Sequence, residues 1–405
     1  MADLEISLLV LLAVAAAVAI LSARVRMPYA IGLIIAGLAL SNVTSFSGPQ
    51  LTKDLLFLVV LPGLLFEGAF KLDFAEFWQA RYSVLMLAVP GLVVSTLLSA
   101  VLLWLAVNEL RAGSVTFDEA LAFGALISAT DPISVLSLFR SLGVDNKLCV
   151  LVEGESLFND GTAVVVFTLV LGFAAGSDTS WMHVTWEFLR ITGLAVLVGT
   201  FIGVGAGVIT RSIDDPTIEL TVTLLCAYGT FIVAEFLGAS GVIACVLAGL
   251  VTGTWGARGM SVSTQTAVDS FWTYTAFLLN SFIFLLIGTE IHLTKLAHYL
   301  PEILLGWVAI NVARAAIVYL KYAVMRAAGS RNFPLSWATL LTWGGLRGGL
   351  SMVLALALPG SFVHRELILH TTYGVVLLTL LVQGLTMKPL VRALGLVRSR
   401  GVLRI

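Results

Sequence analysis

Residues 155–161 read Glu-Ser-Leu-Phe-Asn-Asp-Gly, and an almost wholly apolar stretch follows directly at residues 162–172. A second polar stretch, Ala-Thr-Asp-Pro at residues 129–132, also lies inside an apolar run. An ionised carboxylate without a partner is costly in hydrocarbon, so acids inside membrane spans usually have a function. Here the acids stand beside helix-breaking Pro and Gly. Together the two stretches indicate an ion site inside a membrane protein.

The rest of the chain is apolar throughout. Of its 405 residues, 59% are hydrophobic and 12% are charged, whereas a soluble domain carries about 25% charged residues. Apolar runs long enough to cross a bilayer recur along the whole length. This composition excludes an ordinary soluble enzyme and predicts an all-α polytopic membrane protein embedded in lipid. The net charge of −1 and the lack of basic runs give no indication of a nucleic-acid partner.

Apolar runs between polar breaks predict about thirteen transmembrane helices. The first run lacks a basic n-region and a small-residue cleavage site, so we expect a retained helix rather than a signal peptide. The approximate limits of the runs are 4–23, 28–40, 51–70, 82–107, 118–139, 147–175, 187–210, 216–236, 239–254, 267–291, 299–325, 334–357 and 366–391.

Lysines and arginines are distributed unequally between the expected loops. Cytoplasmic loops carry an excess of these residues, which places the N-terminus outside and the C-terminus in the cytoplasm of a plasma (inner) membrane. The inner side then holds Arg24, Arg26, Lys71, Arg81, Arg140, Lys147, Arg211, Arg258, Lys321, Arg326, Arg331, Lys388, Arg392, Arg398, Arg400 and Arg404. The outer side holds Lys53, Arg111, Arg190, Lys295 and Arg365.

Two of the expected spans look interrupted, one in each half of the chain. In the fifth, Pro132 removes a backbone donor and disfavours helix at the residue before it. In the twelfth, residues 343–349 read Trp-Gly-Gly-Leu-Arg-Gly-Gly, and glycine this dense destabilises a helix. Paired broken spans predict inverted repeats whose broken helices cross at the membrane midplane, where transporters bind their cargo. Loose helix packing through small residues is the alternative.

The charges inside the expected spans are Glu67, Asp131, Glu155, Asp160, Arg314 and Arg347. Ser156 and Asp160 are four residues apart and share a helix face, and Glu155 and Asn159 share the neighbouring face. A break in the fifth span frees the carbonyl of Thr130 to coordinate a cation. The oxygen ligands available to a monovalent cation are therefore on Asp160, Ser156, Asn159, Thr130 and Asp131.

The two buried arginines cannot carry a proton, because a guanidinium does not deprotonate in a protein. Each needs a partner, since an unpaired buried charge is strongly destabilising. We expect Glu155 to pair with Arg314, with Arg347 as the close alternative. Asp160 is then left to carry the proton or the cation. Glu67 is open to a second interpretation, because it lies near the inner end of its span and could face cytoplasmic water.

At these motifs the chain resembles the sodium/proton exchangers of the NhaP and NHE type. The motifs are Leu65-Phe66-Glu67, residues 129–132, residues 154–160, Arg314 and residues 344–348, in the family's order. The resemblance implies an NhaA-like fold of thirteen helices with a dimerisation domain and a mobile core, a homodimer, and alternating access. It implies Na⁺ at Asp160, Ser156, Thr130 and Glu67, with Asp131 and Asn159 beside them. It also implies that Glu155 and an arginine form a structural ion bridge.

We expect residues 1–405 to form a single membrane transport domain without a soluble regulatory domain. The core bundle is expected at about 51–175 and 267–357, and the dimerisation part at about 1–40 and 187–254. No enzymatic activity and no cofactor are expected. The transported ions Na⁺, or Li⁺ or K⁺, and H⁺ are the only ligands.

The resulting hypothesis is antiport of Na⁺ or Li⁺ against H⁺ by competition at Asp160. Asn159 cannot titrate, and it resembles the asparagine that replaces an aspartate of electrogenic relatives, which implies electroneutral one-for-one exchange. A K⁺/H⁺ antiporter stays open as an alternative. A cation channel fits paired broken helices less well. An intramembrane aspartyl protease using Asp131 and Asp160 would leave the buried arginines without a role.

Overall fold

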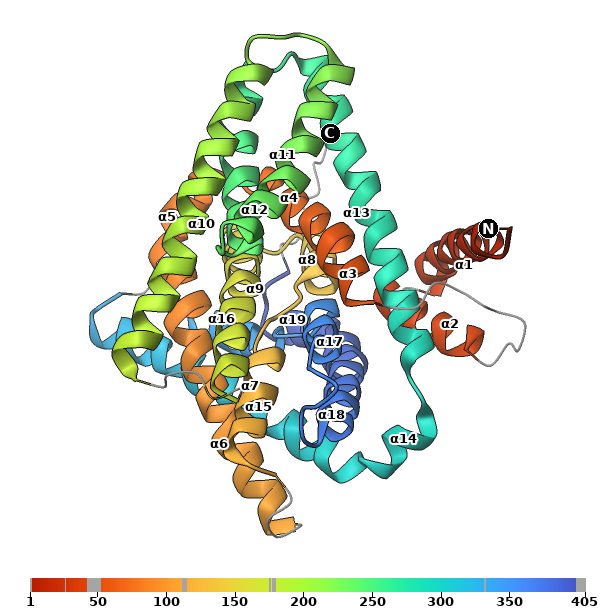
Figure 1. Cartoon of the computed structure of the whole chain (residues 1–405), viewed down its shortest axis with the longest axis vertical. Helices are drawn as coiled ribbons and strands as arrows, with labels where there is room; N and C mark the ends of the chain where they lie inside the picture. Colours follow the sequence, from red (N-terminus) through yellow and green to blue (C-terminus); the bar gives the residue numbers. More distant parts are fainter. Residues whose placement is uncertain are drawn as a thin grey trace. The chain divides into compact units, whose positions relative to one another are not determined.

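The computed structural model describes residues 2–25, 27–41, 52–110, 115–174, 176, 180–330 and 333–397 (Figure 1). Within these ranges every regular element is a helix, which confirms the predicted all-α class. Six basic residues used to predict the orientation lie outside the described residues: Arg26, Arg111, Arg331, Arg398, Arg400 and Arg404.

Nine helical segments of the described chain are long and apolar enough to cross a membrane. They contain α1 (Ala2–Val25), α5 (Phe74–Met86) with α6 (Leu92–Leu110), α9 (Asn146–Ala174), α10 (Trp181–Thr210), α11 (Pro216–Phe236), α12 (Gly241–Val251), α13 (Val262–Glu290), α15 (Leu300–Ala327), and α18 (Arg365–Leu378) with α19 (Leu385–Ala393). Short π-helical turns join the paired segments, at η2 (Leu87–Gly91) and η5 (Thr379–Gly384).

The remaining predicted spans are also helical, but they are short, charged or interrupted. The elements are α2 (Tyr29–Leu40), α3 (Lys53–Leu55) with η1 (Leu56–Val60) and α4 (Leu61–Lys71), α7 (Phe117–Ile127), α8 (Ile133–Leu142), α16 (Leu335–Trp343) and α17 (Gly349–Leu356). Helices η3 (Thr252–Gly256) and η4 (Ala257–Gly259) extend α12, and α14 (Leu293–His298) precedes α15. The number of membrane crossings stays a prediction.

Both predicted interruptions are present. Helix α7 ends at Ile127 and α8 begins at Ile133, while α16 ends at Trp343 and α17 begins at Gly349. The two non-helical stretches meet, because the N–H of Asp131 donates to the carbonyl of Leu346 at 2.7 Å. A Cβ on Gly348 would collide with the Asp131 side chain. The glycines of the second break therefore allow the two broken helices to cross in contact.

The chain divides into two compact units. The first comprises Met1–Ala75, Asp160–His292 and Val353–Pro359, and the second comprises Glu76–Asn159, Leu293–Met352 and Gly360–Ile405. Helices α9 and α17 each begin in the second unit and end in the first. The expected division into a core bundle and a dimerisation part stays a prediction.

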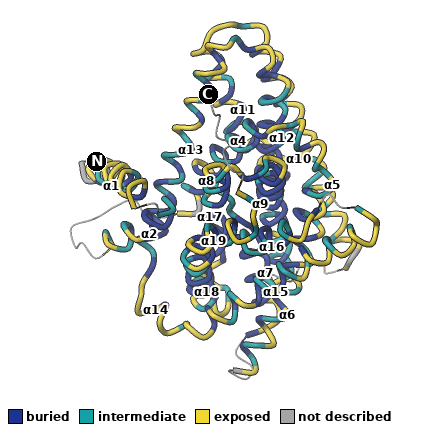
Figure 2. Tube along the Cα trace, turned by 180° about the vertical axis from the view of Figure 1, so that it is seen from behind, coloured by how far each residue is buried: buried dark blue, intermediate teal, exposed yellow. Residues whose placement is uncertain are grey.

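Small residues pack the helices of the first unit closely. A Cβ on Gly203 of α10 would lie 3.0 Å from Ala248 of α12, and one on Gly207 would lie 2.7 Å from the Trp255 ring. Most of α12 is buried, whereas α1 is largely exposed (Figure 2). The exposed side chains of α1 include Ile6 and Leu9, at 59% and 66%. Apolar exposure of this kind suits a helix that faces lipid.

Candidate cation-binding site

The break between α7 and α8 is the centre of the candidate site. Thr116 and Glu119 form a capping box that fixes the start of α7, and Pro132 stands directly before α8. The residues between the helices are non-helical, and Ser128 and Thr130 among them are only 5% and 6% exposed. Backbone groups buried in this way need partners. The following contacts, all within the second unit, supply them.

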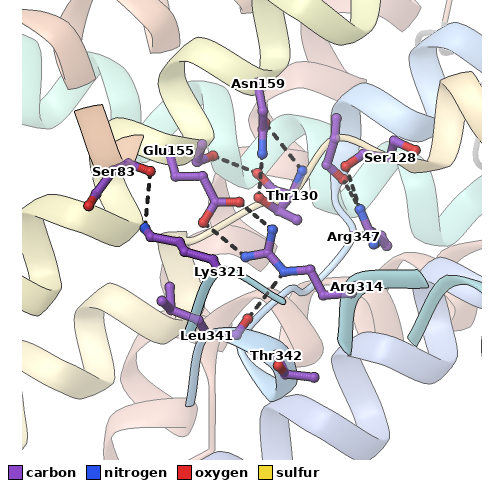
Figure 3. Close-up of polar contacts among 12 residues, drawn as sticks. Ser83, Ser128, Thr130, Glu155, Asn159, Arg314, Lys321, Leu341, Thr342 and Arg347 are labelled. Carbon is purple, nitrogen blue, oxygen red and sulfur yellow. Dashed lines mark hydrogen bonds and ion pairs between the residues drawn. The ribbon is translucent and has the colours of Figure 1, made fainter. Parts of the chain in front are cut away.

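Arg347 of the second break holds the carbonyls of the first (Figure 3). Its Nη1 donates to the carbonyl of Ser128 at 2.6 Å and to that of Ala129 at 3.1 Å. Its backbone N–H donates to Thr379 Oγ1 at 3.2 Å. The side chain is 1% exposed. Arg347 therefore stabilises the non-helical backbone before Pro132, and its Nη1 contacts carbonyls rather than Glu155.

Glu155 is paired with Arg314, the partner that the sequence analysis favoured. Both guanidinium Nη atoms donate to the carboxylate, and the Nη2–Oε2 distance is 2.9 Å. The side chains are 2% and 11% exposed. Arg314 Nε also donates to the carbonyl of Leu341 at 3.3 Å. A bidentate Arg–carboxylate contact of this kind is among the stronger ionic interactions in proteins. It joins α9 to α15 and to the end of α16.

Thr130 is held by two residues of α9. Ser156 Oγ donates to the Thr130 carbonyl at 2.5 Å, and Asn159 Nδ2 donates to Thr130 Oγ1 at 2.7 Å. The Thr130 N–H makes a longer bond, 3.4 Å, to Asn159 Oδ1. The structure thus brings together three of the predicted cation ligands. Asn159 acts through both ends of its amide, which an aspartate could not do.

One carboxylate oxygen of Asp131 accepts a hydrogen bond from the start of the next helix. Its Oδ1 accepts the N–H of Ile133, in the first turn of α8, at 3.0 Å. The residue is half-buried. An acidic side chain at a helix N-terminus is stabilised by the helix dipole and by the free N–H groups there. Asp131 therefore ties the break to the start of α8.

Asp160 and Glu67 belong to the first unit. Asp160 follows Asn159 directly on α9, one helical turn after Ser156, and is half-buried. Glu67 lies on α4, where its Oε1 accepts from Lys71 Nζ at 2.7 Å. The structure places Glu67 in an ion pair, which the sequence analysis did not foresee. The signal was present, because a Glu followed four residues later by a Lys shares a helix face with it.

Lys321 is a buried cation that the sequence analysis missed. It lies on α15, seven residues after Arg314, and is 1% exposed. Its Nζ donates to the carbonyl of Ser83 at 3.2 Å and lies 4.7 Å from the centre of the Phe333 ring. We predicted an inner loop for Lys321. Its position inside the apolar run 299–325 was the signal that could have identified it as buried.

Two small cavities adjoin the Glu155–Arg314 pair. The first is also lined by Ser128, Asn159 and Arg347, and the second by Thr130 and Gly344. Both cavities lie within the second unit. The polar groups that support the first break therefore also line two small cavities beside the ion pair. In the described part of the chain no cluster of His, Cys, Asp and Glu has the form of a resident metal site.

A family model and a solved structure define the class of protein. A transmembrane sodium/hydrogen exchanger family model matches residues 9–393. The solved structure of the sodium proton antiporter MjNhaP1 from Methanocaldococcus jannaschii shares the fold, with a TM-score of 0.78 over 97% of this chain and 98% of that one, at 20% identity. The chain therefore has the fold of an integral membrane antiporter.

Two relatives are more similar to this chain in sequence than MjNhaP1 is. The chain is 39% identical over 377 residues to the Na⁺/H⁺ antiporter ApNhaP of Aphanothece halophytica, covering 93% of this chain and 71% of the relative. It is 35% identical over 416 residues to the Na⁺/H⁺ antiporter NhaH of Halobacillus dabanensis, covering 98% and 99%. The chain belongs to the sodium/hydrogen exchanger family.

Proposed function

We propose that this protein exchanges Na⁺ for H⁺ across a membrane by alternating access, as a transporter and not an enzyme. Membership of the family and relatives named as Na⁺/H⁺ antiporters support the proposal. The observation that carries it is the arrangement of α9. Ser156 and Asn159 hold the broken helix through Thr130, and Asp160 is the next residue along.

Asp160 is the carrier in this proposal. The carboxylate of Glu155 is neutralised by Arg314, and Asn159 has no proton to exchange. Asp160 remains on the same helix as a carboxylate that can bind either a proton or a cation. Na⁺ takes oxygen ligands, and Ser156 Oγ, the Thr130 carbonyl, Asp131 and Glu67 are the proposed companions of Asp160 around it. Hard cations prefer oxygen donors of these kinds.

Competition at one carboxylate couples the two fluxes. When Na⁺ binds, the proton leaves; when the proton returns on the other side, Na⁺ is released. Each ion carries one positive charge, so the carboxylate exchanges them one for one and the cycle moves no net charge. The exchange is therefore electroneutral in this proposal, and Na⁺ and H⁺ are its cargo with no cofactor.

The proposed setting is a homodimer in the plasma (inner) membrane, with the N-terminus outside and the C-terminus in the cytoplasm. The distribution of Lys and Arg between the expected loops supports this orientation. Cysteine accessibility at both ends of the chain, in intact cells and in permeabilised ones, tests it. Labelling of an N-terminal cysteine only after permeabilisation would contradict the orientation.

Purified protein reconstituted into proteoliposomes with an imposed pH gradient tests the exchange itself. Addition of Na⁺ or Li⁺ is expected to dissipate the gradient, and clamping the voltage with K⁺ and valinomycin is expected to leave the rate unchanged. Dissipation by K⁺ with no response to Na⁺ would contradict the proposed cargo. A current that reverses with the Na⁺ gradient on a supported membrane would contradict electroneutrality.

A further inference from the structure

The carboxylate of Glu67 forms an ion pair with a cation of the protein itself, the ammonium of Lys71. Glu67 and Lys71 stand one turn apart on α4, and Lys71 Nζ lies 2.7 Å from Glu67 Oε1. The same ammonium donates to Thr273 Oγ1, on α13, at 2.5 Å. All three residues lie in the first unit. The Glu67 and Lys71 side chains are 21% and 26% exposed, so the pair is partly shielded but still reached by water.

The oxygen atoms around the Lys71 ammonium are of the kinds that bind a monovalent cation. Thr273 Oγ1 gives its own hydrogen to the carbonyl of Asp269 at 2.6 Å, so toward Lys71 it acts as an acceptor. The ammonium is thus coordinated by a carboxylate oxygen and a hydroxyl oxygen, the ligand types that alkali cations take. Lysine suits this role because its charge is compact and its four-carbon stem is flexible.

We propose that Lys71 is a tethered competitor of the transported cation at Glu67 and thereby sets the apparent affinity for Na⁺. This inference rests on the proposed function, in which Glu67 is a cation ligand. Lys71 occupies Oε1 of Glu67, and two cations on one carboxylate repel each other, so Na⁺ binds Glu67 more tightly once Lys71 has left it. Partial exposure lowers the cost of that departure, because water can solvate the freed ammonium.

A purely mechanical role is the competing explanation. Lys71 also links α4 to α13 through Thr273, and loss of such a link would impair transport without raising affinity for the cation. The two roles predict different changes in the affinity for Na⁺ when Lys71 is replaced. A competitor weakens Na⁺ binding, so its removal tightens binding; a structural tie supports the fold, so its removal leaves Na⁺ binding unchanged or weaker.

The test uses full-length protein in detergent and radioactive Na⁺ in a scintillation proximity assay, which requires no transport. Lys71→Met keeps the apolar stem without the charge and is expected to lower the apparent Kd for Na⁺ about two- to fivefold, the range for partly exposed ion pairs. Lys71→Arg, which keeps a charge at the site, is the matched control and is expected to stay near the wild-type value. Thr273→Val removes the α13 contact and leaves the competitor on Glu67.

A second background makes the result specific to Glu67. In Glu67→Gln protein the Lys71→Met change is expected to have no effect on Na⁺ binding, because the shared carboxylate is gone. An unchanged or weaker Kd in Lys71→Met would overturn the proposal, as would an equal shift in the Glu67→Gln background. Failure of the proposed function is read separately, as absence of Na⁺-driven proton flux in wild-type proteoliposomes.

Discussion

The two broken helices differ in what they bring to the place where they cross. The break between α7 and α8 presents oxygen atoms, from the carbonyls of residues 128–130 and the carboxylate of Asp131. The break between α16 and α17 presents glycines, which allow close approach, and the guanidinium of Arg347. The first break supplies the oxygen atoms that the proposed function assigns to the cation, and the second supplies the donor that supports the first.

The two arginines of the site have different partners. Arg347 satisfies carbonyls of the first break, while Arg314 neutralises Glu155 beside it. Each arginine removes a different obstacle to leaving a non-helical stretch inside a membrane: unpaired backbone in one case and unpaired charge in the other. The following predictions separate these support roles from cation binding.

The largest effect is expected at the ion pair. Glu155→Gln leaves the Arg314 charge buried without its counter-charge, and it is expected to lower the free energy of unfolding by about 3–5 kcal/mol. The double variant Glu155→Leu with Arg314→Met removes both charges and is expected to recover most of that loss. Thermal unfolding in detergent measures both. A double variant as unstable as the single one would show that the pair is not the source of the effect.

Removal of the guanidinium from the second break comes next. Arg347→Met leaves the carbonyls of Ser128 and Ala129 without their donor, and unsatisfied buried groups cost about 1–3 kcal/mol each. We expect a loss of about 2–4 kcal/mol in unfolding free energy and severe loss of exchange. Arg347→Lys keeps a charged donor nitrogen on a side chain of different shape and is expected to be intermediate. Wild-type stability in Arg347→Met would refute the support role of the second break.

A smaller effect is expected from crowding the crossing point. Gly348→Ala places a methyl group against the Asp131 side chain, and overpacking of this kind costs about 1–3 kcal/mol. Gly360→Ala is the matched control, because nothing lies within 4 Å of its added Cβ. The Na⁺ concentration for half-maximal exchange is expected to rise in Gly348→Ala alone. Equal behaviour of the two variants would mean that the crossing tolerates the extra methyl group.

The smallest effect is expected at the Thr130 hydroxyl. Thr130→Val keeps the shape and the backbone carbonyl but removes the acceptor of Asn159 Nδ2. We expect a loss of about 0.5–1.5 kcal/mol in unfolding free energy, typical of one hydrogen bond, and a modest rise in the apparent KM for Na⁺. Thr342→Val, which removes only a bond to the carbonyl of Ala338 on its own helix, is the control. Unaltered KM in Thr130→Val would indicate that the Asn159 contact does not position the site.

The sequence predicted the fold class and both interruptions, because Pro132 and the glycines of residues 344–349 act on the local backbone. It favoured Arg314 as the partner of Glu155 but left Arg347 as the close alternative. Helical spacing orders residues on one helix, whereas the pairing depends on how distant helices pack. The double contact of Asn159 with Thr130 was hidden for the same reason.

Other features were readable in the sequence but were assigned elsewhere. Lys71 stands four residues after Glu67, and that spacing alone indicates a pair on one helix face. Lys321 lies within an apolar run and is buried in the structure, although a basic residue near the end of a span more often reaches the interface. In both cases a charge attributed to a loop belongs to the helix, and the loop interpretation concealed a contact.

Proton flux in Asp160→Asn proteoliposomes tests the central claim most directly, with wild type in parallel under the same imposed pH gradient. The substitution keeps the shape of the side chain and removes its ability to bind a proton. We predict that Na⁺-driven dissipation of the gradient is lost, while the thermal stability of the purified protein stays close to wild type. Retained Na⁺-dependent exchange in the folded variant would contradict competition between proton and cation at Asp160.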